Sequence, residues 1–212
     1  MEGKPMRIAT RTFVLALAAL ALVAGEAQAG PTKGRPLKTG QTTTYGAAGD
    51  TTAGLSRMYN DLGNGVIKDQ RTGLFWEKKS DDGSIHDWEK IYTWSTGNNS
   101  FNGTAATVFL ATLNTAPCFG GFCDWRLPTR FELETILDLG NLNPAVPAVF
   151  NTNCTAGCTV TTCSCTRSSG YGSSSAYPSG PSGAWYVYFT NGYVSYGGKT
   201  DYRFVRAVRS GS

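Results

Sequence analysis

Histidine, charged residues and long apolar runs are all scarce in this sequence, and each scarcity excludes something. Of the 212 residues, 16% are charged and one, His86, is a histidine. Nucleophilic catalysis needs a base beside a Ser or Cys and a carboxylate to orient that base, and no motif places such groups around His86. We therefore expect His86 to be an exposed loop residue or a hydrogen-bonded structural one, and we predict no catalytic residue and no enzyme.

The longest apolar run, residues 13–24, is too short to cross a bilayer, because a transmembrane helix takes about 20 apolar residues. It follows Arg7 and Arg11 and precedes the small-x-small triplet Ala27-Gln28-Ala29. This layout is typical of a secretory signal peptide, so we expect residues 1–29 to be removed. The mature protein is then exported, periplasmic or extracellular, and has no transmembrane span.

The rest of the chain divides into a lead segment and a domain. Residues 30–55 consist largely of Thr, Gly, Lys and Pro, so we expect a flexible lead segment. Residues 56–212 are enough for one compact domain. The formal charge of +4 falls to +3 without the leader, which carries three cations and two carboxylates. Such a mild excess predicts no nucleic-acid partner.

All six cysteines follow the predicted leader, at positions 118, 123, 154, 158, 163 and 165. An even number of cysteines in an exported chain predicts disulfides, and six cysteines allow 15 pairings. Spacing reduces the number of plausible pairings. Cys118 and Cys123 can close a small loop, and a 158–163 bridge can nest inside a 154–165 bridge. Zinc is the alternative, but the Cys163-Ser164-Cys165 spacing fits no standard structural zinc site. We predict neither a metal nor a cofactor.

Strand and helix signals alternate along the domain. Residues 57–77 predict a pair of strands with turns, and the 61–65 loop predicts a tight turn because it lacks the carboxylate pattern of a calcium-binding EF-hand. Apolar spacing predicts a first helix over residues 104–114. The Ser/Gly/Tyr-rich residues 168–183 predict long surface loops. Strands follow from residue 184, with Asn191-Gly192 as a hairpin signal, and at 204–209.

A second helix begins within Asp124–Glu134. Thr129 is the predicted N-cap, and Glu132, three residues later, completes a capping box. Pro128 holds the chain before the cap extended. Apolar residues at helical spacing then form one face, and Gly140 is expected to end the helix.

Two further residues of this stretch have expected structural tasks. We expect Arg126 to pair inside the protein and Trp125 to be structural. Together with Pro128, Thr129 and Glu132 they are therefore predicted to be structural rather than catalytic.

Several motifs occur in one order along the chain: residues 72–77, 124–129 followed by Glu132 and Leu133, 167–169, 184–187 with Asn191-Gly192, and 205–209. Over residues 57–210 they resemble the Lcl C-terminal domain family, typified by the C-terminal domain of the Legionella collagen-like adhesin. The Arg-Leu-Pro-Thr-x-x-Glu helix start is also similar to that of the sulfatase-modifying, formylglycine-generating fold. The resemblance implies a C-type-lectin-like α+β fold, with two short helices packed on antiparallel strands and long disulfide-stapled loops.

For the adhesin, the resemblance implies glycosaminoglycan binding by a trimer. The collagen-like repeat that accompanies the adhesin domain is absent from this sequence, so a homotrimer remains an open alternative. The Glu-Pro-Asn, Gln-Pro-Asp and Trp-Asn-Asp sets by which calcium-dependent C-type lectins hold sugars are absent as well. We therefore expect any sugar binding to be independent of calcium.

The leading hypothesis is an exported, non-catalytic binding or adhesion module for an acidic polysaccharide, such as a glycosaminoglycan, or a surface glycan. Arginine binds sulfate and carboxylate groups bidentately, and aromatic faces stack on sugars. The candidate ligand-binding residues are Arg167, Tyr186, Tyr188, Lys199, Arg203 and Arg206. The simpler interpretation is that Arg206 and Arg209 flank a strand and that the tyrosines merely cover the sheet.

Two other functions also fit the sequence. One is a structural or protein-interaction domain of the bacterial envelope, with the loops at 168–183 as a recognition surface. The other is an enzyme of the formylglycine-generating type, which would need a reactive cysteine pair. Cys163 and Cys165 are the candidates for that pair, but they lie in a Ser-rich segment without an evident general base.

Overall fold

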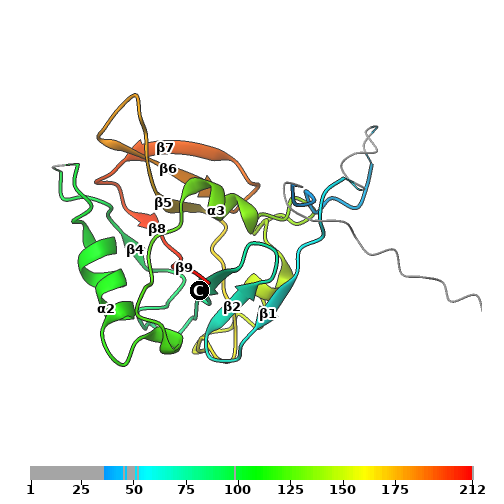
Figure 1. Cartoon of the computed structure of the whole chain (residues 1–212), viewed down its shortest axis with the longest axis horizontal. Helices are drawn as coiled ribbons and strands as arrows, with labels where there is room; N and C mark the ends of the chain where they lie inside the picture. The colour runs from blue at the N-terminus through cyan, green and yellow to red at the C-terminus, as the bar shows by residue number, and fades with distance from the viewer. Residues whose placement is uncertain (1–35, 45, 47–50, 52, 98, 212) are drawn as a thin grey trace, which may run out of the picture. The chain divides into compact units, whose positions relative to one another are not determined.

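The computed structural model describes residues 36–44, 46, 51, 53–97 and 99–211, so the predicted signal peptide and the start of the lead segment lie outside the described residues. The described strands and helical segments alternate along the chain (Figure 1). The strands are β1 (Tyr59–Asp61), β2 (Val66–Asp69), β3 (Leu74–Glu77), β4 (Ile91–Tyr92), β5 (Gly170–Ala176), β6 (Gly183–Tyr188), β7 (Val194–Gly198), β8 (Arg203–Phe204) and β9 (Val208–Ser210). The helical segments are η1 (Ala105–Leu110), α2 (Ala111–Asn114), η2 (Phe119–Gly121), α3 (Arg130–Thr135) and η3 (Ala148–Phe150).

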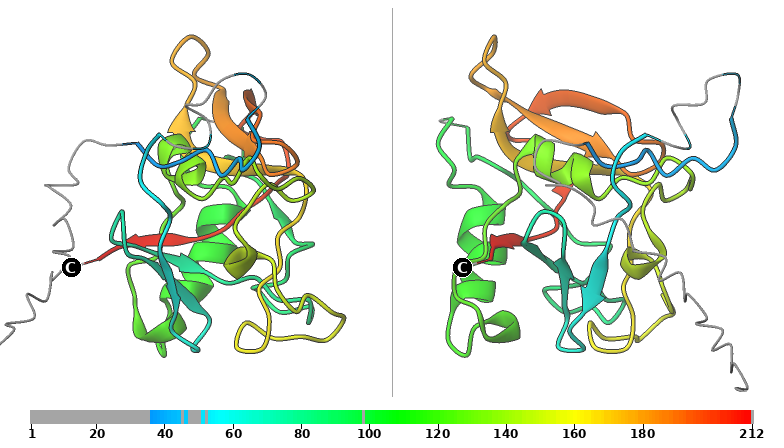
Figure 2. Two further views of the ribbon diagram at one scale, coloured as in Figure 1. Left: turned by 90° about the vertical axis from the view of Figure 1, so that its right-hand side faces the viewer. Right: turned by 45° about the vertical axis from the view of Figure 1, so that its right-hand side comes forward.

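The strands form two sheets, which confirms the α+β class. One sheet has the order β1-β2-β3-β9 and is antiparallel throughout. The other has the order β4-β8-β5-β6-β7, in which β5 and β8 are parallel and the other pairs antiparallel. Figure 2 shows the β5–β6–β7 group and the β1–β2 pair as separate layers, with α3 beside the first of them.

Two apolar clusters hold these layers together. The first joins the sheets through Trp76 and Val187 and includes Leu133 of α3, together with Ile136 and Leu137, which directly follow the helix. The second packs Phe109 of η1 and Leu113 of α2 together with Val66 of β2, Tyr92 of β4 and Trp125. Trp76 has no exposed surface, as expected for a core residue. The helix predicted at 104–114 is present as the continuous run of η1 and α2.

β5 corrects the prediction of surface loops at 168–183. Its Gly/Ser-rich sequence has weak strand propensity, yet it is paired on both edges, with β8 and with β6. Tyr171 is fully buried in the first cluster, and the Ser173 hydroxyl donates to the carbonyl of Trp185 at 2.7 Å. Burial and pairing on both edges therefore outweigh the weak propensity.

The C-terminal stretch differs from the single strand predicted at 204–209. Residues 203–204 form β8 in one sheet, and residues 208–210 form β9 in the other, as Figure 1 shows. Val205, Arg206 and Ala207 lie between the two strands and are buried. This change of sheet places Arg206 inside the protein rather than on a strand face.

Two boundaries also differ from the predictions. α3 ends at Thr135, five residues before Gly140, and the backbone N–H of Ile136 already bonds in the tighter pattern to Leu133. Residues 36–41 of the lead segment are anchored rather than loose: the N–H of Lys38 donates to Leu55 at 2.9 Å, and the carbonyl of Thr39 accepts from Leu139 at 2.7 Å.

All six cysteines form disulfides, Cys118–Cys123, Cys154–Cys165 and Cys158–Cys163. The small loop and the nested pair expected from the spacing are thus confirmed. Cys158, Cys163 and Cys165 bring their sulfur atoms within 4.8 Å of one another, but each sulfur is already bonded in a disulfide. Within the described part of the chain, no helix has the length and apolar content to cross a membrane.

Candidate functional site

Strands β5, β6 and β8 bring three of the predicted ligand-binding residues to one face of the five-stranded sheet. Residues opposite one another on paired strands share a face, and Gly172 opposes Tyr186 while Gly170 opposes Tyr188. Tyr171 pairs with Phe204 in the core, so Arg203, one residue earlier, is on the same outer face as the tyrosines. We call Tyr186, Tyr188, Tyr193 and Arg203 the tyrosine face.

Glycines make room for the rings of the tyrosine face. A Cβ atom at Gly170 would lie 3.3 Å from the Tyr186 ring and 3.4 Å from the Tyr188 ring. At Gly197 it would lie 2.6 Å from the Arg203 guanidinium. Because these glycines have no side chain, the aromatic rings and the guanidinium can lie across the neighbouring strands.

The groups of the tyrosine face contact one another in sequence. The Arg203 guanidinium carbon is 4.4 Å from the centroid of the Tyr186 ring. Tyr186 meets Tyr188 edge to face at 5.3 Å, and Tyr188 is stacked on Tyr193 at 6.0 Å. Tyr193 is 60% exposed. The neighbouring Tyr186 raises the pKa of Tyr188 above its usual value, so Tyr188 is a phenol rather than a phenolate at neutral pH.

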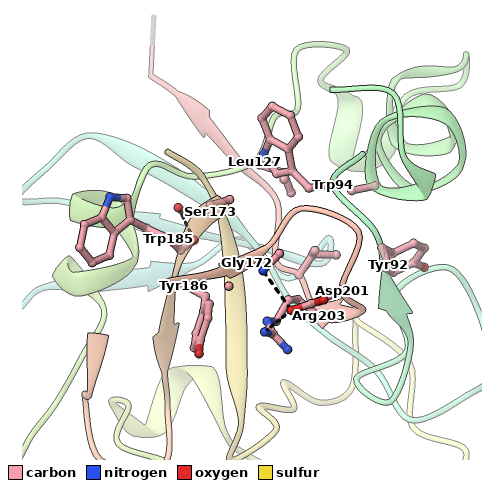
Figure 3. Close-up of a pocket in the computed structure, with 14 residues that line it drawn as sticks. Tyr92, Trp94, Leu127, Gly172, Ser173, Trp185, Tyr186, Asp201 and Arg203 are labelled. Carbon is pink, nitrogen blue, oxygen red and sulfur yellow. Dashed lines mark hydrogen bonds and ion pairs between the residues drawn. The ribbon is translucent and has the colours of Figure 1, made fainter. Parts of the chain in front are cut away.

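A pocket lies beside the tyrosine face (Figure 3). Strands β5, β6, β7 and β8 line one part of it, and the segment that carries Tyr92 and Trp94 lines another. Asp201 and Arg203 both line it, and their Oδ2 and Nη2 atoms are 3.0 Å apart. Figure 3 shows Trp185 on the opposite side of β6 from Tyr186. The indole N–H of Trp94, which also lines the pocket, is buried and has no hydrogen-bond partner among the described residues.

Arg206 is wrongly predicted as a ligand-binding residue, because it has no exposed surface. Its guanidinium donates to the carbonyls of Glu77 at 2.9 Å and Cys165 at 2.7 Å and to the Thr166 hydroxyl at 2.8 Å. These bonds fix the segment between β8 and β9. The interpretation of Arg206 as a framework residue is therefore the better one.

Lys199 and Arg167 lie apart from the tyrosine face. Lys199 is only 6% exposed, and its Nζ is 4.2 Å from the centroid of the Trp94 ring, so little of it can reach a ligand. Arg167 pairs with Glu89 at 3.1 Å, and its guanidinium lies 5.1 Å from the Trp88 ring in a separate hollow. The structure therefore brings together Tyr186, Tyr188 and Arg203, and not all six candidates.

The stretch 124–134 has the structural tasks expected of it. The Thr129 hydroxyl accepts from the N–H of Glu132 at 3.2 Å, and the Glu132 carboxylate accepts from the N–H of Thr129 at 2.7 Å, which completes the capping box. Arg126 holds the same carboxylate with two bonds, of 2.8 and 2.7 Å. Burial opposes the charge of Glu132, but Arg126 and the Thr129 N–H outweigh it and lower the pKa of Glu132.

Two other residues of that stretch complete the framework. Trp125 is 3% exposed, and its indole N–H donates to the carbonyl of Phe119 at 2.9 Å. Pro128 is buried, and its carbonyl accepts from the N–H of Ser174 at 2.7 Å, which ties the helix start to β5.

A buried charge cluster around Glu77 escaped the sequence analysis. The Glu77 carboxylate accepts from Lys79 at 3.2 Å and from the N–H of Ala207 at 2.9 Å, and one of its oxygens is 2.7 Å from Nδ1 of His86. His86 is thus the hydrogen-bonded structural histidine that was expected as one of two alternatives. Burial works against the charge of Glu77, but Lys79, His86 and Ala207 together lower its pKa. The signal in the sequence was the three successive charges in Trp-Glu-Lys-Lys, at the end of a buried strand.

Comparison with known proteins gives one match. The family model described as the Lcl C-terminal domain matches residues 65–209. No curated protein and no solved structure matches the chain. The C-type-lectin-like part of the fold assignment therefore stays a prediction.

Proposed function

From the premise that the chain belongs to the Lcl C-terminal domain family, we propose that it is an exported, non-catalytic adhesion module that binds an acidic polysaccharide or surface glycan without calcium. A binding or adhesion module fits the family, and the disulfides fit an exported protein. The tyrosine face is the proposed binding surface.

One observation carries this proposal: a guanidinium and three phenol rings are contiguous on a half-exposed sheet face. A sugar ring has apolar C–H faces that pack on aromatic rings, and its hydroxyls can bond to the phenols. Arg203 adds two or more N–H donors in a planar fork, which suits a sulfate or carboxylate group.

Asp201 competes with an acidic ligand for Arg203. It already pairs with Arg203 at 3.0 Å and accepts from the N–H of Gly198 at 3.1 Å. An acidic sugar must therefore replace the Asp201 carboxylate at Arg203. Replacing Asp201 with Asn should remove this competition and keep the oxygen that caps Gly198.

The test is salt-gradient elution from heparin, in EDTA, of the wild type and of three variants. Arg203→Ala should bind about tenfold more weakly, because it removes a charged hydrogen-bond donor from the surface. Asp201→Asn should elute at higher salt than the wild type. Arg71→Ala is the matched control, because Arg71 is exposed in the turn between β2 and β3 and donates to Ser56, and it should elute with the wild type.

A protein-interaction domain of the envelope is the second candidate function. It is favoured by Leu139 and Leu142, which are 38% and 66% exposed and line one hollow together with Asn191. Capture of an envelope protein that Leu142→Ala abolishes, with no retention on heparin and no signal on a glycan array, would replace the glycan proposal with this one.

A further inference from the structure

A second group of aromatic residues lies at the far end of the β5–β6 hairpin. Tyr177 and Tyr196 are stacked, with ring centroids 3.8 Å apart and planes 4° apart. Trp185 stands edge-on to both rings, at 5.3 and 5.8 Å. The Arg130 guanidinium then lies between Trp185 and Phe131, at 5.1 and 4.2 Å from the two rings. We call these five residues the aromatic strip.

The aromatic strip is on the opposite side of the sheet from the tyrosine face. Trp185 pairs with Tyr196 across β6 and β7, whereas Tyr186 pairs with Ser195. Successive residues of a strand point to opposite faces. Trp185 therefore shares its face with Val187, which is buried in the first cluster. Arg130 and Phe131 are the first two residues of α3, so the aromatic strip lies next to the start of that helix.

The aromatic strip is open to solvent and carries no net charge. Tyr196 and Phe131 are 50% and 67% exposed. Its only cation, Arg130, is paired with Glu134 at 3.0 Å. Tyr177 raises the pKa of Tyr196, which keeps that phenol neutral at neutral pH.

Hydroxyl groups occur in the same part of the chain as the rings. Ser174, Ser179 and Ser182 are exposed in the segment that runs from β5 through the hairpin to β6, and Tyr177 and Tyr196 supply their own phenol groups. An aromatic surface with phenol hydroxyls and a neutralised cation matches a neutral sugar, whose C–H face is apolar and whose edge is covered with hydroxyls.

We infer that the aromatic strip is a second carbohydrate subsite, and that it takes a neutral sugar ring of a polysaccharide. The inference rests on the proposed glycan binding for its class of ligand, but on residues that the tyrosine face does not use. A polysaccharide of alternating acidic and neutral sugars is the ligand that engages both surfaces.

The test is affinity electrophoresis of the full mature protein in native gels that contain a neutral polysaccharide, with dextran, mannan and hydroxyethyl cellulose as probes. At least one of these should retard the wild type. Tyr196→Ala should weaken the retardation about three- to tenfold, as expected for one lost ring contact, while Tyr196→Phe should keep most of it. Tyr193→Ala is the comparison variant, because Tyr193 is 60% exposed, against 50% for Tyr196, but belongs to the tyrosine face. Thermal unfolding of each variant checks that it is folded.

The outcomes separate the two surfaces. No retardation in any of the neutral gels, or equal retardation of the wild type and folded Tyr196→Ala, overturns the inference, and the tyrosine face is unaffected if Arg203→Ala still loses heparin. Retardation that only Tyr193→Ala removes also overturns it, because the neutral sugar then binds at the tyrosine face. Retardation lost in Tyr196→Ala without heparin binding supports the aromatic strip and contradicts the acidic ligand.

Discussion

Glu77 has no exposed surface, and its carboxylate is bonded to Lys79, His86 and the N–H of Ala207. Its carbonyl also accepts from Arg206, so one residue joins β3 to the segment between β8 and β9. Removing one member of a buried ionic group leaves the others unpaired at low dielectric, which costs more than the group contributes as a whole. We therefore infer that this cluster stabilises the fold by holding β3 against the segment between β8 and β9.

The lowered pKa of Glu77 predicts loss of stability in acid. The folded carboxyl binds its proton less tightly than the unfolded one, whose pKa is about 4.3. Its contribution is therefore complete above about pH 4.3 and disappears as the pH falls through the folded pKa. Urea unfolding should show a falling free energy of unfolding below about pH 5 for the wild type.

Glu77→Gln tests the same prediction by substitution. It should cost about 3 kcal/mol or more at neutral pH and should flatten the acid dependence. Glu89→Gln, at a half-exposed ion pair with Arg167, is the control and should change stability by less than about 1 kcal/mol. Equal stability and an equal acid slope in Glu77→Gln and the wild type would show that Glu77 is not charged in the fold.

At this scale, short sequence spacing was predictive and long-range contact was not. The capping box and the three disulfides depend on residues 3 to 11 positions apart, so their spacing could be read directly. The contact between Glu77 and Arg206 joins residues 129 positions apart. No local pattern marks such a pair, which is why Arg206 was predicted to face a ligand.

At the scale of elements, α3 depends on its first turn. The helix is only six residues long, and a helix of this length is not stable by itself. The Thr129 cap, the Glu132 carboxylate and the bidentate Arg126 together satisfy the start of the helix and fasten it to the chain before it. Leu133 in the helix and Ile136 directly after it are both fully buried in the first cluster.

Thr129→Ala should lower the free energy of unfolding by about 1 kcal/mol, because it removes the oxygen that accepts from the N–H of Glu132. Thr129→Ser keeps that oxygen and should be close to the wild type. Heparin elution of the folded protein should be the same for all three. Unchanged stability with lost binding would mean that Thr129 contacts the ligand and that the cap is incidental.

Elements that depend on a local sequence signal were predicted well. Elements that depend on pairing with other strands were predicted poorly. The hairpin between β6 and β7 turns through Asn191-Gly192, with Gly192 at φ 82°. β5 was missed because Gly and Ser have weak strand propensity, and its pairing partners lie elsewhere in the chain. The same glycines leave the space in which the rings of the tyrosine face lie, so the weak strand signal and the site have one origin.

At the scale of the whole molecule, the two sides of the five-stranded sheet present two different surfaces. The tyrosine face combines a guanidinium with phenols, and the aromatic strip combines rings with a neutralised cation. Residues 163–212 are rich in arginine and tyrosine, but only the fold separates the partly exposed Tyr188 and Arg203 from the buried Arg206 and Lys199. The sequence could therefore predict the chemistry of the candidate site and three of its four residues. It could not predict that Arg206 is buried, because the change of sheet at 205–207 places it in the interior.

The most direct test of the central claim is an NMR titration of the full mature protein with a heparin oligosaccharide, in EDTA. The account predicts saturable amide shifts centred on Tyr186, Tyr188, Tyr193 and Arg203, weakened by added salt because screening reduces exposed charge contacts. It also predicts that Arg203→Ala loses these shifts. Saturable shifts confined to other surfaces, or a requirement for calcium, would contradict it.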